Sequence, residues 1–529
     1  MSESEAIARW HVPHSWSWVE IGNICDVIGG GTPSTSESAN FADGDIPWIT
    51  PADLSGYTNK YIESGTRAIT SRGLAGSGAR LLPAGTVLFS SRAPIGYVAI
   101  AKSSVATNQG FKSFVPPSGL TSDYLYYYLQ HAKRFAVELS SGTTFQEISG
   151  KRAAQIPLAV APEAEQPRIV EKLEELLSDL DAGVAALERA RSNLKRYRAA
   201  VLKAAVDGRL TEKWRAAHPD AEPAEKLLER ILVERRKKWE KAQLEKFAEK
   251  GQAAPKGWKD KYPEPIKPDV ASLPALPSGW IWASLEQLIV EGPQNGLYLP
   301  KEKYRNGIPI LRIDDYQNDS SRSSADLQQV QASSEERETY ELRVGDILVN
   351  RVNSPSHLGK CIAIQERHVP ALFESNMMRF AVSSLVRPDF VIGYLRSVHG
   401  RVRLTCNAKW AVNQASINQQ DVLKTPVPLP SPAEQTAVVE EMEHRISVTT
   451  ASELEARVSV TRSARLRQSI LKRAFEGKLV PQDPKDEPAS ELLARIRAIR
   501  AVAVKGDSGI RKKMRLRASD YVKKTLSNK

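Results

Sequence analysis

Polar side chains suited to nucleic-acid recognition recur in two regions of the sequence, in loops between short runs of β-type residues. Arginine can bind guanine through two hydrogen bonds, and asparagine or glutamine can bind adenine in the same way. Hydroxyl groups and lysines can hold phosphate oxygens. The candidates in the first region are Thr32, Ser34, Thr35, Ser91, Arg92, Asn108, Gln109, Lys112, Thr143 and Thr144. Those in the second region are Asn350, Arg351, Asn353, Asn376, Arg379, Lys409, Trp410 and Asn413. Taken singly, each is more often an ordinary solvated loop residue, so the DNA-binding hypothesis depends on their grouping.

The sequence lacks the motifs of nucleotide hydrolases and of adenine methyltransferases. The phosphate-binding loop of nucleotide hydrolases needs a glycine-rich turn ending in GK[ST], and none occurs. An adenine methyltransferase needs two prolines followed by an aromatic residue, but Pro116-Pro117 is followed by Ser118. The 3 cysteines are isolated, and the 8 histidines form no pair spaced for a metal. We therefore expect no catalytic residue, no metal and no cofactor in this chain.

The charge of the chain favours a polyanionic partner. Lysine and arginine number 74 against 62 acidic residues, which gives a formal net charge of +12. Such an excess favours binding to nucleic acid, because lysine and arginine pair with phosphates. The simpler interpretation is that the charge only keeps the chain soluble. No run of about 18 apolar residues suggests a membrane span, and Met1 to Trp10 does not resemble a signal peptide. We expect a cytoplasmic protein without membrane association.

The sequence contains a long internal duplication. Six matches occur in the same order at offsets of 260–269 residues. They include Trp16 with Trp280, Gly85 with Gly345, and Ala164-Glu165-Gln166 with Ala433-Glu434-Gln435. This period far exceeds the 20–50 residues of solenoid repeats. The globular parts of the two copies differ mainly in their polar residues, which favours one fold with two ligands over neutral drift.

Hydrophobic periodicity predicts an α+β protein in which two mixed α/β domains are joined by two long helices. We predict domains at 1–157 and 277–427, helical regions at 158–250 and 428–500, a Pro/Lys-rich linker at 251–276 and a basic tail at 501–529. The short strands, bounded by turn residues, should be mainly antiparallel.

The long helices carry heptad repeats. Glu163 to Val206 contains two apolar series, Leu173/Leu180/Leu187/Leu194/Val201 and Ile169/Leu176/Gly183/Ala190/Tyr197/Ala204. Together they predict a coiled-coil seam. Pro432 to Phe475 is less regular, with candidate seam residues Val439, Met442, Ile446, Leu454, Val458, Leu466 and Ile470. We expect the two helices to form an antiparallel coiled coil; the alternative is two independent helices, each lying on its own domain.

Several motifs resemble the specificity subunits of type I restriction–modification systems. They are Gly30-Gly31-Thr32-Pro33-Ser34-Thr35 with Gly44-Asp45-Ile46-Pro47-Trp48-Ile49, and Ser91-Arg92-Ala93-Pro94-Ile95-Gly96 with Asn108-Gln109-Gly110. Pro432-Ala433-Glu434-Gln435 and the segment from Gly477-Lys478-Leu479 to Leu492-Leu493 are similar to that family's helical regions. The second globular region departs from the pattern, with Gly292-Pro293-Gln294-Asn295-Gly296 in place of the GGTP run.

The resemblance implies a role in phage defence. Each globular region would be a target-recognition domain that reads one part of a bipartite, asymmetric double-stranded DNA site, and the helices would set the unread gap. Two methyltransferase subunits would supply S-adenosylmethionine and methylate adenine N6, and restriction subunits using ATP and Mg²⁺ would cut unmodified DNA. The chain itself would be non-catalytic. The alternatives are a fused restriction–modification enzyme, which the missing motifs disfavour, and a coiled-coil scaffold without sequence-specific DNA binding.

Overall fold

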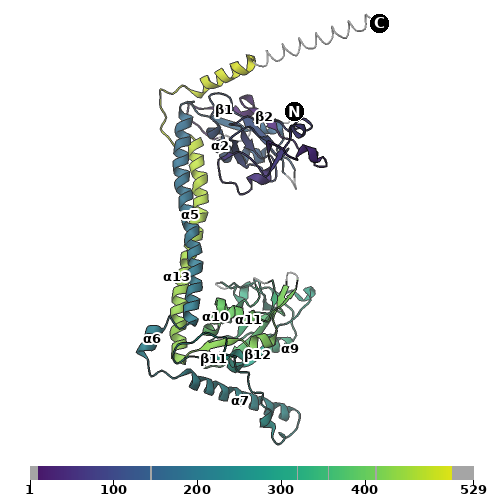
Figure 1. Cartoon of the computed structure of the whole chain (residues 1–529), viewed down its shortest axis with the longest axis vertical. Coiled ribbons are helices and arrows are strands. Elements are labelled where there is room, and N and C mark those ends of the chain that lie inside the picture. Colours follow the sequence, from purple (N-terminus) through teal and green to yellow (C-terminus); the bar gives the residue numbers. More distant parts are fainter. Residues whose placement is uncertain (1–9, 143–145, 318–319, 355–356, 412–413, 503–529) are drawn as a thin grey trace, which may run out of the picture. The chain divides into compact units, whose positions relative to one another are not determined.

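The chain divides into two compact units. The computed structural model describes residues 10–142, 146–317, 320–354, 357–411 and 414–502. The first unit combines Met1–Ala186 with Ser459–Lys529, and the second is Leu187–Val458. Each unit contains one globular domain together with parts of the two long helices α5 (Glu165–Val206) and α13 (Pro432–Phe475), which run side by side in Figure 1.

The first domain has two sheets and a strand pair. A five-stranded sheet has the order β2-β9-β6-β7-β4, a three-stranded sheet the order β5-β3-β8, and β1 pairs with β10. Helix α2 is capped by Thr121, whose hydroxyl accepts a hydrogen bond from the Tyr124 amide at 3.2 Å. The strands are β1 (Ser17–Glu20), β2 (Asp26–Gly29), β3 (Ile46–Ile49), β4 (Tyr61–Ile62), β5 (Arg67–Ile69), β6 (Val87–Phe89), β7 (Val98–Ala101), β8 (Ala106–Thr107), β9 (Lys112–Val115) and β10 (Pro157–Val160). The short helices are α1 (Ser71–Ala75), α2 (Ser122–His131), α3 (Lys133–Glu138) and α4 (Gly150–Ala153).

The second domain follows the same plan and adds a small sheet. Its sheets have the orders β12-β19-β15-β17, β14-β13-β18 and β16-β21-β20, and β11 pairs with β22. The strands are β11 (Ile281–Ser284), β12 (Ile289–Asn295), β13 (Ile308–Leu311), β14 (Gln329–Val330), β15 (Ile347–Asn350), β16 (Val352–Asn353), β17 (Cys361–Ala363), β18 (Leu372–Phe373), β19 (Met377–Val382), β20 (Lys409–Ala411), β21 (Gln414–Ser416) and β22 (Pro426–Leu429). The helices are α6 (Glu212–Ala217), α7 (Ala224–Glu249), α8 (Leu285–Leu288), α9 (Ser334–Tyr340), α10 (Pro388–Arg396), α11 (Val398–Thr405) and α12 (Gln419–Leu423).

The duplication extends to individual main-chain hydrogen bonds. The amide of Asn108 donates to the carbonyl of Ile49 at 3.0 Å, and that of Glu374 donates to Leu311 at 3.1 Å. Strand β3 pairs in parallel with β8, as β13 does with β18, while most other pairs are antiparallel. The predicted α+β class, with two mixed domains of one fold, is confirmed.

The two long helices pack against each other in antiparallel fashion within each unit. In the first unit, Ile169 and Leu173 of α5 share a core with Leu471 and Phe475 of α13. In the second unit, the Arg198 guanidinium donates to the Thr450 hydroxyl at 2.6 Å, while Val201 shares a core with residues nearer the start of α13. Partner numbers on α13 fall as numbers on α5 rise. The predicted antiparallel coiled coil is therefore confirmed.

One of the two predicted seam series is wrong in the middle of the helix. Leu173, Leu180, Leu187, Leu194 and Val201 are buried or half-buried, as expected. Of the second series, Ile169 is buried and Leu176 and Ala204 are half-buried, but Gly183, Ala190 and Tyr197 are exposed. The inward positions in this part of the helix lie one residue further along the chain, at Leu177, Val184, Arg191, Arg198 and Ala205. The sequence offers leucine at both 176 and 177, so spacing alone could not choose the register.

The second helix shows the same kind of error. Val439 and Met442 are buried and Ile446 and Ile470 are half-buried, as predicted, but Leu454, Val458 and Leu466 are 56%, 58% and 49% exposed. Small residues such as Ala456 and Ser463 take the inward positions. Arg191 and Arg198 of α5 are half-buried in the same seam, and the Arg198 guanidinium donates to the Thr450 hydroxyl of α13. Long side chains of this kind can bury their aliphatic stems while their charged ends stay paired.

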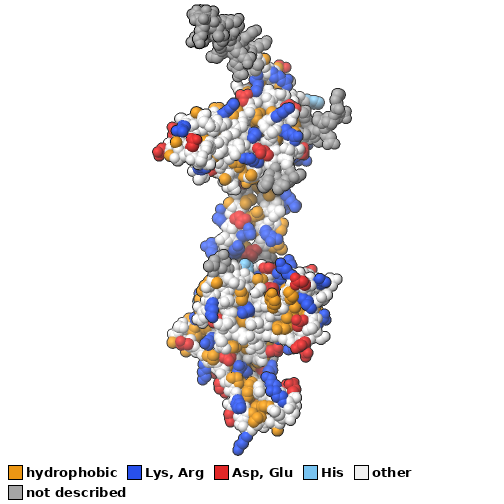
Figure 2. Space-filling view, turned by 90° about the vertical axis from the view of Figure 1, so that its right-hand side faces the viewer, with side chains coloured by type: hydrophobic (Ala, Val, Ile, Leu, Met, Phe, Trp, Pro, Cys, Tyr) orange, Lys and Arg blue, Asp and Glu red, His pale blue; other side chains and the backbone are white. Residues whose placement is uncertain are grey.

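Charged side chains of both signs cover the surface. On the face drawn in Figure 2, Lys and Arg side chains are interspersed with Asp and Glu. Among the described residues, none of the helices combines the length and the apolar character that a membrane span requires. No single-sign patch dominates this face, so charge does not mark a nucleic-acid interface on it.

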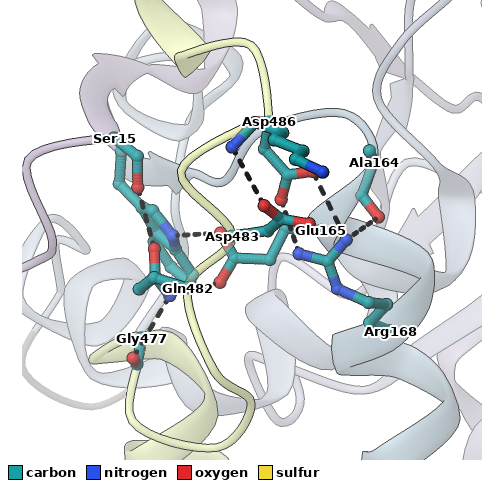
Figure 3. A network of polar contacts seen from close by, with 10 residues as sticks. Ser15, Ala164, Glu165, Arg168, Gly477, Gln482, Asp483 and Asp486 are labelled. Atoms are coloured by element: carbon teal, nitrogen blue, oxygen red, sulfur yellow. Dashed lines mark hydrogen bonds and ion pairs between the residues drawn. The ribbon is translucent and has the colours of Figure 1, made fainter.

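A buried glutamate near the start of each long helix joins it to its domain. In the first unit, Glu165 accepts a hydrogen bond from the Trp16 indole at 2.9 Å and another from Gln482 at 2.6 Å. Figure 3 shows this network, in which Arg168 pairs with Asp486. In the second unit, Glu434 accepts from the Trp280 indole at 2.8 Å. The repeated tryptophan thus binds the repeated glutamate, which explains why both recur in the sequence.

Candidate nucleic-acid interface

In the first domain, the structure brings together five candidates from three loops and the start of β9. The Thr32 hydroxyl donates to Gln109 Oε1, which joins the loop after β2 to the loop before β9. Lys112 Nζ donates to the Gln109 carbonyl at 3.2 Å and lies 3.5 Å from the Ser91 hydroxyl. Arg92 follows Ser91 in the loop after β6. These residues form what we call the first-domain cluster: Thr32, Ser91, Arg92, Gln109 and Lys112.

The glycine run before Thr32 allows this close approach of loops. A Cβ atom at Gly30 would lie 2.0 Å from the carbonyl oxygen of Asn108, well inside contact distance. A Cβ at Gly31 would lie 2.2 Å from the amide nitrogen of Ala79. The run therefore serves backbone packing, and it places Thr32 against Gln109.

Glu147 belongs to the same cluster, although sequence analysis did not select it. Its carboxylate lies 3.5 Å from the Arg92 guanidinium and 3.9 Å from Lys112 Nζ. Burial lowers the pKa of Lys112, and the Arg92 charge lowers it further, whereas Glu147 raises it. Base edges and phosphates are usually bound by cationic and amide side chains, so residue type gave no reason to predict a carboxylate at this position.

The other candidates of the first domain lie beside the cluster. Ser34 and Thr35 are exposed, and the Ser34 hydroxyl lies 2.8 Å from that of Ser36. Asn108 accepts from the Gly110 amide at 2.9 Å, which shapes the turn that presents Gln109. Thr143 and Thr144 lie outside the described residues.

In the second domain, two candidates are buried and hold the framework. Asn350 is 0% exposed and accepts a hydrogen bond from the Tyr316 hydroxyl. Arg379 is 5% exposed; it pairs with Glu291 at 3.0 Å and donates to Gln294 at 2.7 Å. Side chains so enclosed and so fully bonded are typical of structural roles, and this placement gives no support to base contact.

The remaining candidates of the second domain lie nearer the surface. Arg351 is half-buried and donates to the Ser375 carbonyl at 3.2 Å, and Asn376 is half-buried beside it. Asn353 is half-buried in β16, where its side chain accepts from the Ser354 amide at 2.6 Å.

A small sheet presents two further candidates to solvent. All three residues of β20 are exposed, and Trp410 is 66% exposed. Strand β20 pairs with β21, which in turn pairs with β16. Lys409 and Trp410 therefore stand together on an exposed edge strand. Asn413, between β20 and β21, lies outside the described residues.

The shared framework aligns the two sets of side chains position by position. The Ser91 amide donates to the Gly110 carbonyl at 2.7 Å, and the Arg351 amide donates to the Asn376 carbonyl at 2.8 Å. Ser91 therefore corresponds to Arg351, and Gly110 to Asn376. Arg92 is bridged to Glu147 in the first domain, and Val352 is paired with Ser416 in the second, both in antiparallel fashion. Arg92 therefore corresponds to Val352, and Glu147 to Ser416.

Lys112 matches Met378, since Ser90 is bridged to Phe111 and its counterpart Asn350 pairs with Met377. At these matched positions, one backbone carries two different sets of side chains. Among the described residues, no group of three or more His, Cys, Asp or Glu side chains lies close enough to hold a metal ion.

Comparisons with known proteins point to one family. Residues 13–189 match the family model described as the type I restriction modification DNA specificity domain. The chain is 41% identical over 160 residues to the type I restriction enzyme MjaIX specificity subunit of Methanocaldococcus jannaschii, a match that covers 30% of this chain and 37% of that one. It is 25% identical over 521 residues to the EcoDI specificity subunit of Escherichia coli, covering 95% of this chain and 99% of that one.

The fold has a solved counterpart. A chain from a structure on complex assembly and conformational transition of the type I R-M system aligns with a TM-score of 0.62 at 15% identity, covering 89% of this chain and 100% of that chain. The motif matches, the full-length similarity and the duplicated fold agree with one another. Residues 13–189 therefore carry a type I restriction modification DNA specificity domain, and the chain is similar over almost its whole length to a specificity subunit of a type I restriction enzyme.

Proposed function

We propose that this chain reads a bipartite, asymmetric double-stranded DNA site, with one part of the site bound by each domain. One observation carries the proposal: the two domains share a main-chain framework but hold different side chains at matched positions. Ser91 occupies the loop position in the first domain that Arg351 occupies in the second, and Lys112 corresponds to Met378. Sequence is read by side chains on base edges, so one framework with two sets of side chains suits two different half-sites.

The chain is the non-catalytic subunit of its system, as a specificity subunit is. We propose that it recruits two methyltransferase subunits, which methylate adenine N6 with S-adenosylmethionine, and restriction subunits that use ATP and Mg²⁺. Flipping the target adenine would then fall to the methyltransferase pocket. A role on cellular DNA supports a cytoplasmic location.

A map of N6-methyladenine tests the proposal. The map is made in cells that express the neighbouring methyltransferase gene, with and without this chain. We expect a two-part motif with a fixed unread gap that is methylated only when this chain is present. If the methyltransferase is active and no such motif depends on the chain, the proposal is wrong.

A substitution in the second domain tests which part of the motif it reads. Replacing Arg351 with Ala should relax one base-pair position of one half-site by about 1–3 kcal/mol, the value of a lost two-bond base contact. The matched control is Ser91→Ala, which changes the equivalent position of the first domain. It should leave the half-site that the second domain reads unaffected. A uniform loss of affinity on all sequences would mean that Arg351 contacts only phosphate.

The second candidate function is a coiled-coil scaffold that does not select DNA sequence. The confirmed coiled coil favours it as the runner-up. Binding of the chain with its methyltransferase partner to duplexes of random and motif sequence separates the two functions, because a scaffold shows no sequence preference.

A further inference from the structure

Glu147 holds two cations of the first-domain cluster at once. The carboxylate lies 3.5 Å from Arg92 and 3.9 Å from Lys112. The Lys112 side chain is 15% exposed, whereas those of Arg92 and Glu147 are 39% and 42% exposed. A half-open ion pair of this kind is accessible to a competing anion from solvent.

The backbone fixes where this carboxylate stands. The Glu147 amide donates to the Ser141 carbonyl at 3.0 Å, and the Ser141 amide donates back to Glu147 at 3.0 Å. The next residue, Ile148, donates to the Ser91 carbonyl at 3.0 Å and is fully buried. Glu147 is therefore anchored between the two cations by its neighbours, and its position does not depend on the ion pairs.

The charges in the cluster do not balance. Two cations share one carboxylate, which leaves one positive charge in excess. Burial and the Arg92 charge both disfavour the charged form of Lys112, so a further anion would stabilise it. A DNA phosphate supplies such an anion, because phosphate oxygens accept strong hydrogen bonds from lysine and arginine.

The second domain folds without this arrangement. Ser416 stands where Glu147 does, and Val352 stands where Arg92 does. Met378 occupies the position of Lys112. All three charges are absent from the matched positions, although the main-chain bonds around them are kept. The ion pairs are therefore not a requirement of the fold.

We propose that Glu147 is a specificity-determining residue, whose carboxylate competes with DNA phosphates for Arg92 and Lys112. On non-cognate DNA, the carboxylate keeps both cations and weakens binding. On the cognate half-site, base contacts hold the DNA close enough for a phosphate to displace the carboxylate. Such a repulsive element discriminates by penalising the wrong partner. This inference rests on the proposed function, since it presupposes a cognate site.

The test is binding by the full chain in complex with its methyltransferase partner, with Glu147→Gln as the variant. Fluorescence anisotropy with cognate and non-cognate duplexes gives Kd at several salt concentrations. We expect non-cognate binding to tighten by about 5- to 10-fold, and log K against log salt to steepen by about 1, the value for one added phosphate contact. Cognate binding should change less than about 3-fold, so the specificity ratio falls.

Two controls distinguish competition for the cations from a general change of charge. Glu63→Gln breaks an exposed ion pair with Lys102, 3.0 Å long, in the same domain and changes the net charge equally. It should leave the salt slope and the specificity ratio unchanged. In a double variant with Arg92→Val, the side chain of the second domain, the tightening caused by Glu147→Gln should shrink.

The outcomes separate this inference from the proposed function. If Glu147→Gln behaves like Glu63→Gln while the wild-type complex prefers its cognate site, the inference is wrong and the proposed function stands. If the wild-type complex shows no sequence preference, the proposed function is wrong and the inference falls with it. If Glu147→Gln does not fold, Glu147→Ser, the side chain of the second domain, gives the same reading.

Discussion

Replacing each of the two repeated glutamates with glutamine should destabilise the two units to very different extents. Glu434 is 3% exposed and accepts from the Arg215 guanidinium at 2.7 and 3.0 Å, from the Thr211 hydroxyl at 2.7 Å and from the Trp280 indole. Both carboxylate oxygens therefore face donors. In Glu434→Gln, the new NH₂ group must face one of those donors, and Arg215 loses its counter-ion.

Glu165 has no charged donor on either oxygen in the network of Figure 3. Its partners are the Trp16 indole and the Gln482 amide. Arg168 is paired with Asp486 instead. In Glu165→Gln, the Gln482 amide can turn over and offer its oxygen, with the Ser15 hydroxyl rotating to match. Hydrogen bonding can thus be restored in the first unit but not in the second.

The magnitudes follow from these partners. Breaking a buried ion pair costs about 3–5 kcal/mol, and the low end applies here because the Arg215 side chain is 21% exposed. We expect about 3 kcal/mol for Glu434→Gln. For Glu165→Gln, a rearranged neutral hydrogen bond predicts about 1 kcal/mol or less.

Hydrogen exchange measured by mass spectrometry checks this contrast locally, since a chain of 529 residues in two units does not unfold in one step. Amides of the first turns of α13 should exchange about 100-fold faster in Glu434→Gln, the equivalent of about 3 kcal/mol. The first turns of α5 should accelerate less than about 10-fold in Glu165→Gln. Equal acceleration in the two variants, or the reverse order, would refute the reasoning from partners.

Three further predictions concern burial. Burial lowers the pKa of His131 from 6.5 to about 4. Between pH 6.5 and 4, His131 is protonated in the unfolded chain but not in the folded chain. Urea titrations should therefore show that the free energy of unfolding of the first unit falls by up to about 3 kcal/mol over this range. His131→Phe should flatten this loss, and an unchanged pH profile would contradict the assignment. Leu187→Asp or Leu194→Asp should lower the thermal unfolding temperature by an amount equivalent to about 2 kcal/mol. Ala190 is exposed, so the control Ala190→Asp should change that temperature little. Equal effects would contradict the corrected seam. A thiol reagent should modify exposed Cys406 in the native protein and reach the two buried cysteines only on unfolding; rapid reaction of a second thiol would show that the core is open.

The sequence predicted the architecture well because repetition reveals it. Trp16 and Trp280, and Glu165 and Glu434, recur because each pair makes the same buried contact. The helical register was not predictable in the same way, because adjacent leucines at 176 and 177 fit either frame. The packing of α5 against α13 decides between them, and that packing is seen only in the structure. The limits of the domains remain predictions.

The candidate site was predictable by residue type but not by orientation. Asn350 and Arg379 have side chains typical of base contact, yet both are enclosed by the framework. Thr32 and Gln109 are 77 residues apart, and only the sheet topology brings them together. Glu147 was missed because a carboxylate beside two cations matters through competition, which residue type alone does not indicate.

The division of the first unit between two distant segments has a consequence for synthesis on the ribosome. The Trp10 indole donates to the Phe475 carbonyl at 2.6 Å, and Ile169 and Leu173 share a core with the last turn of α13. Translation at about 5–20 residues per second needs roughly 15–50 s to make the intervening second unit. The second unit is continuous in sequence and can fold first. Until the end of α13 has been made, the first domain keeps an apolar face exposed. The domain that is translated first is thus the last to be completed, and a chain that stops short of the final turns of α13 damages the domain at the opposite end of the sequence.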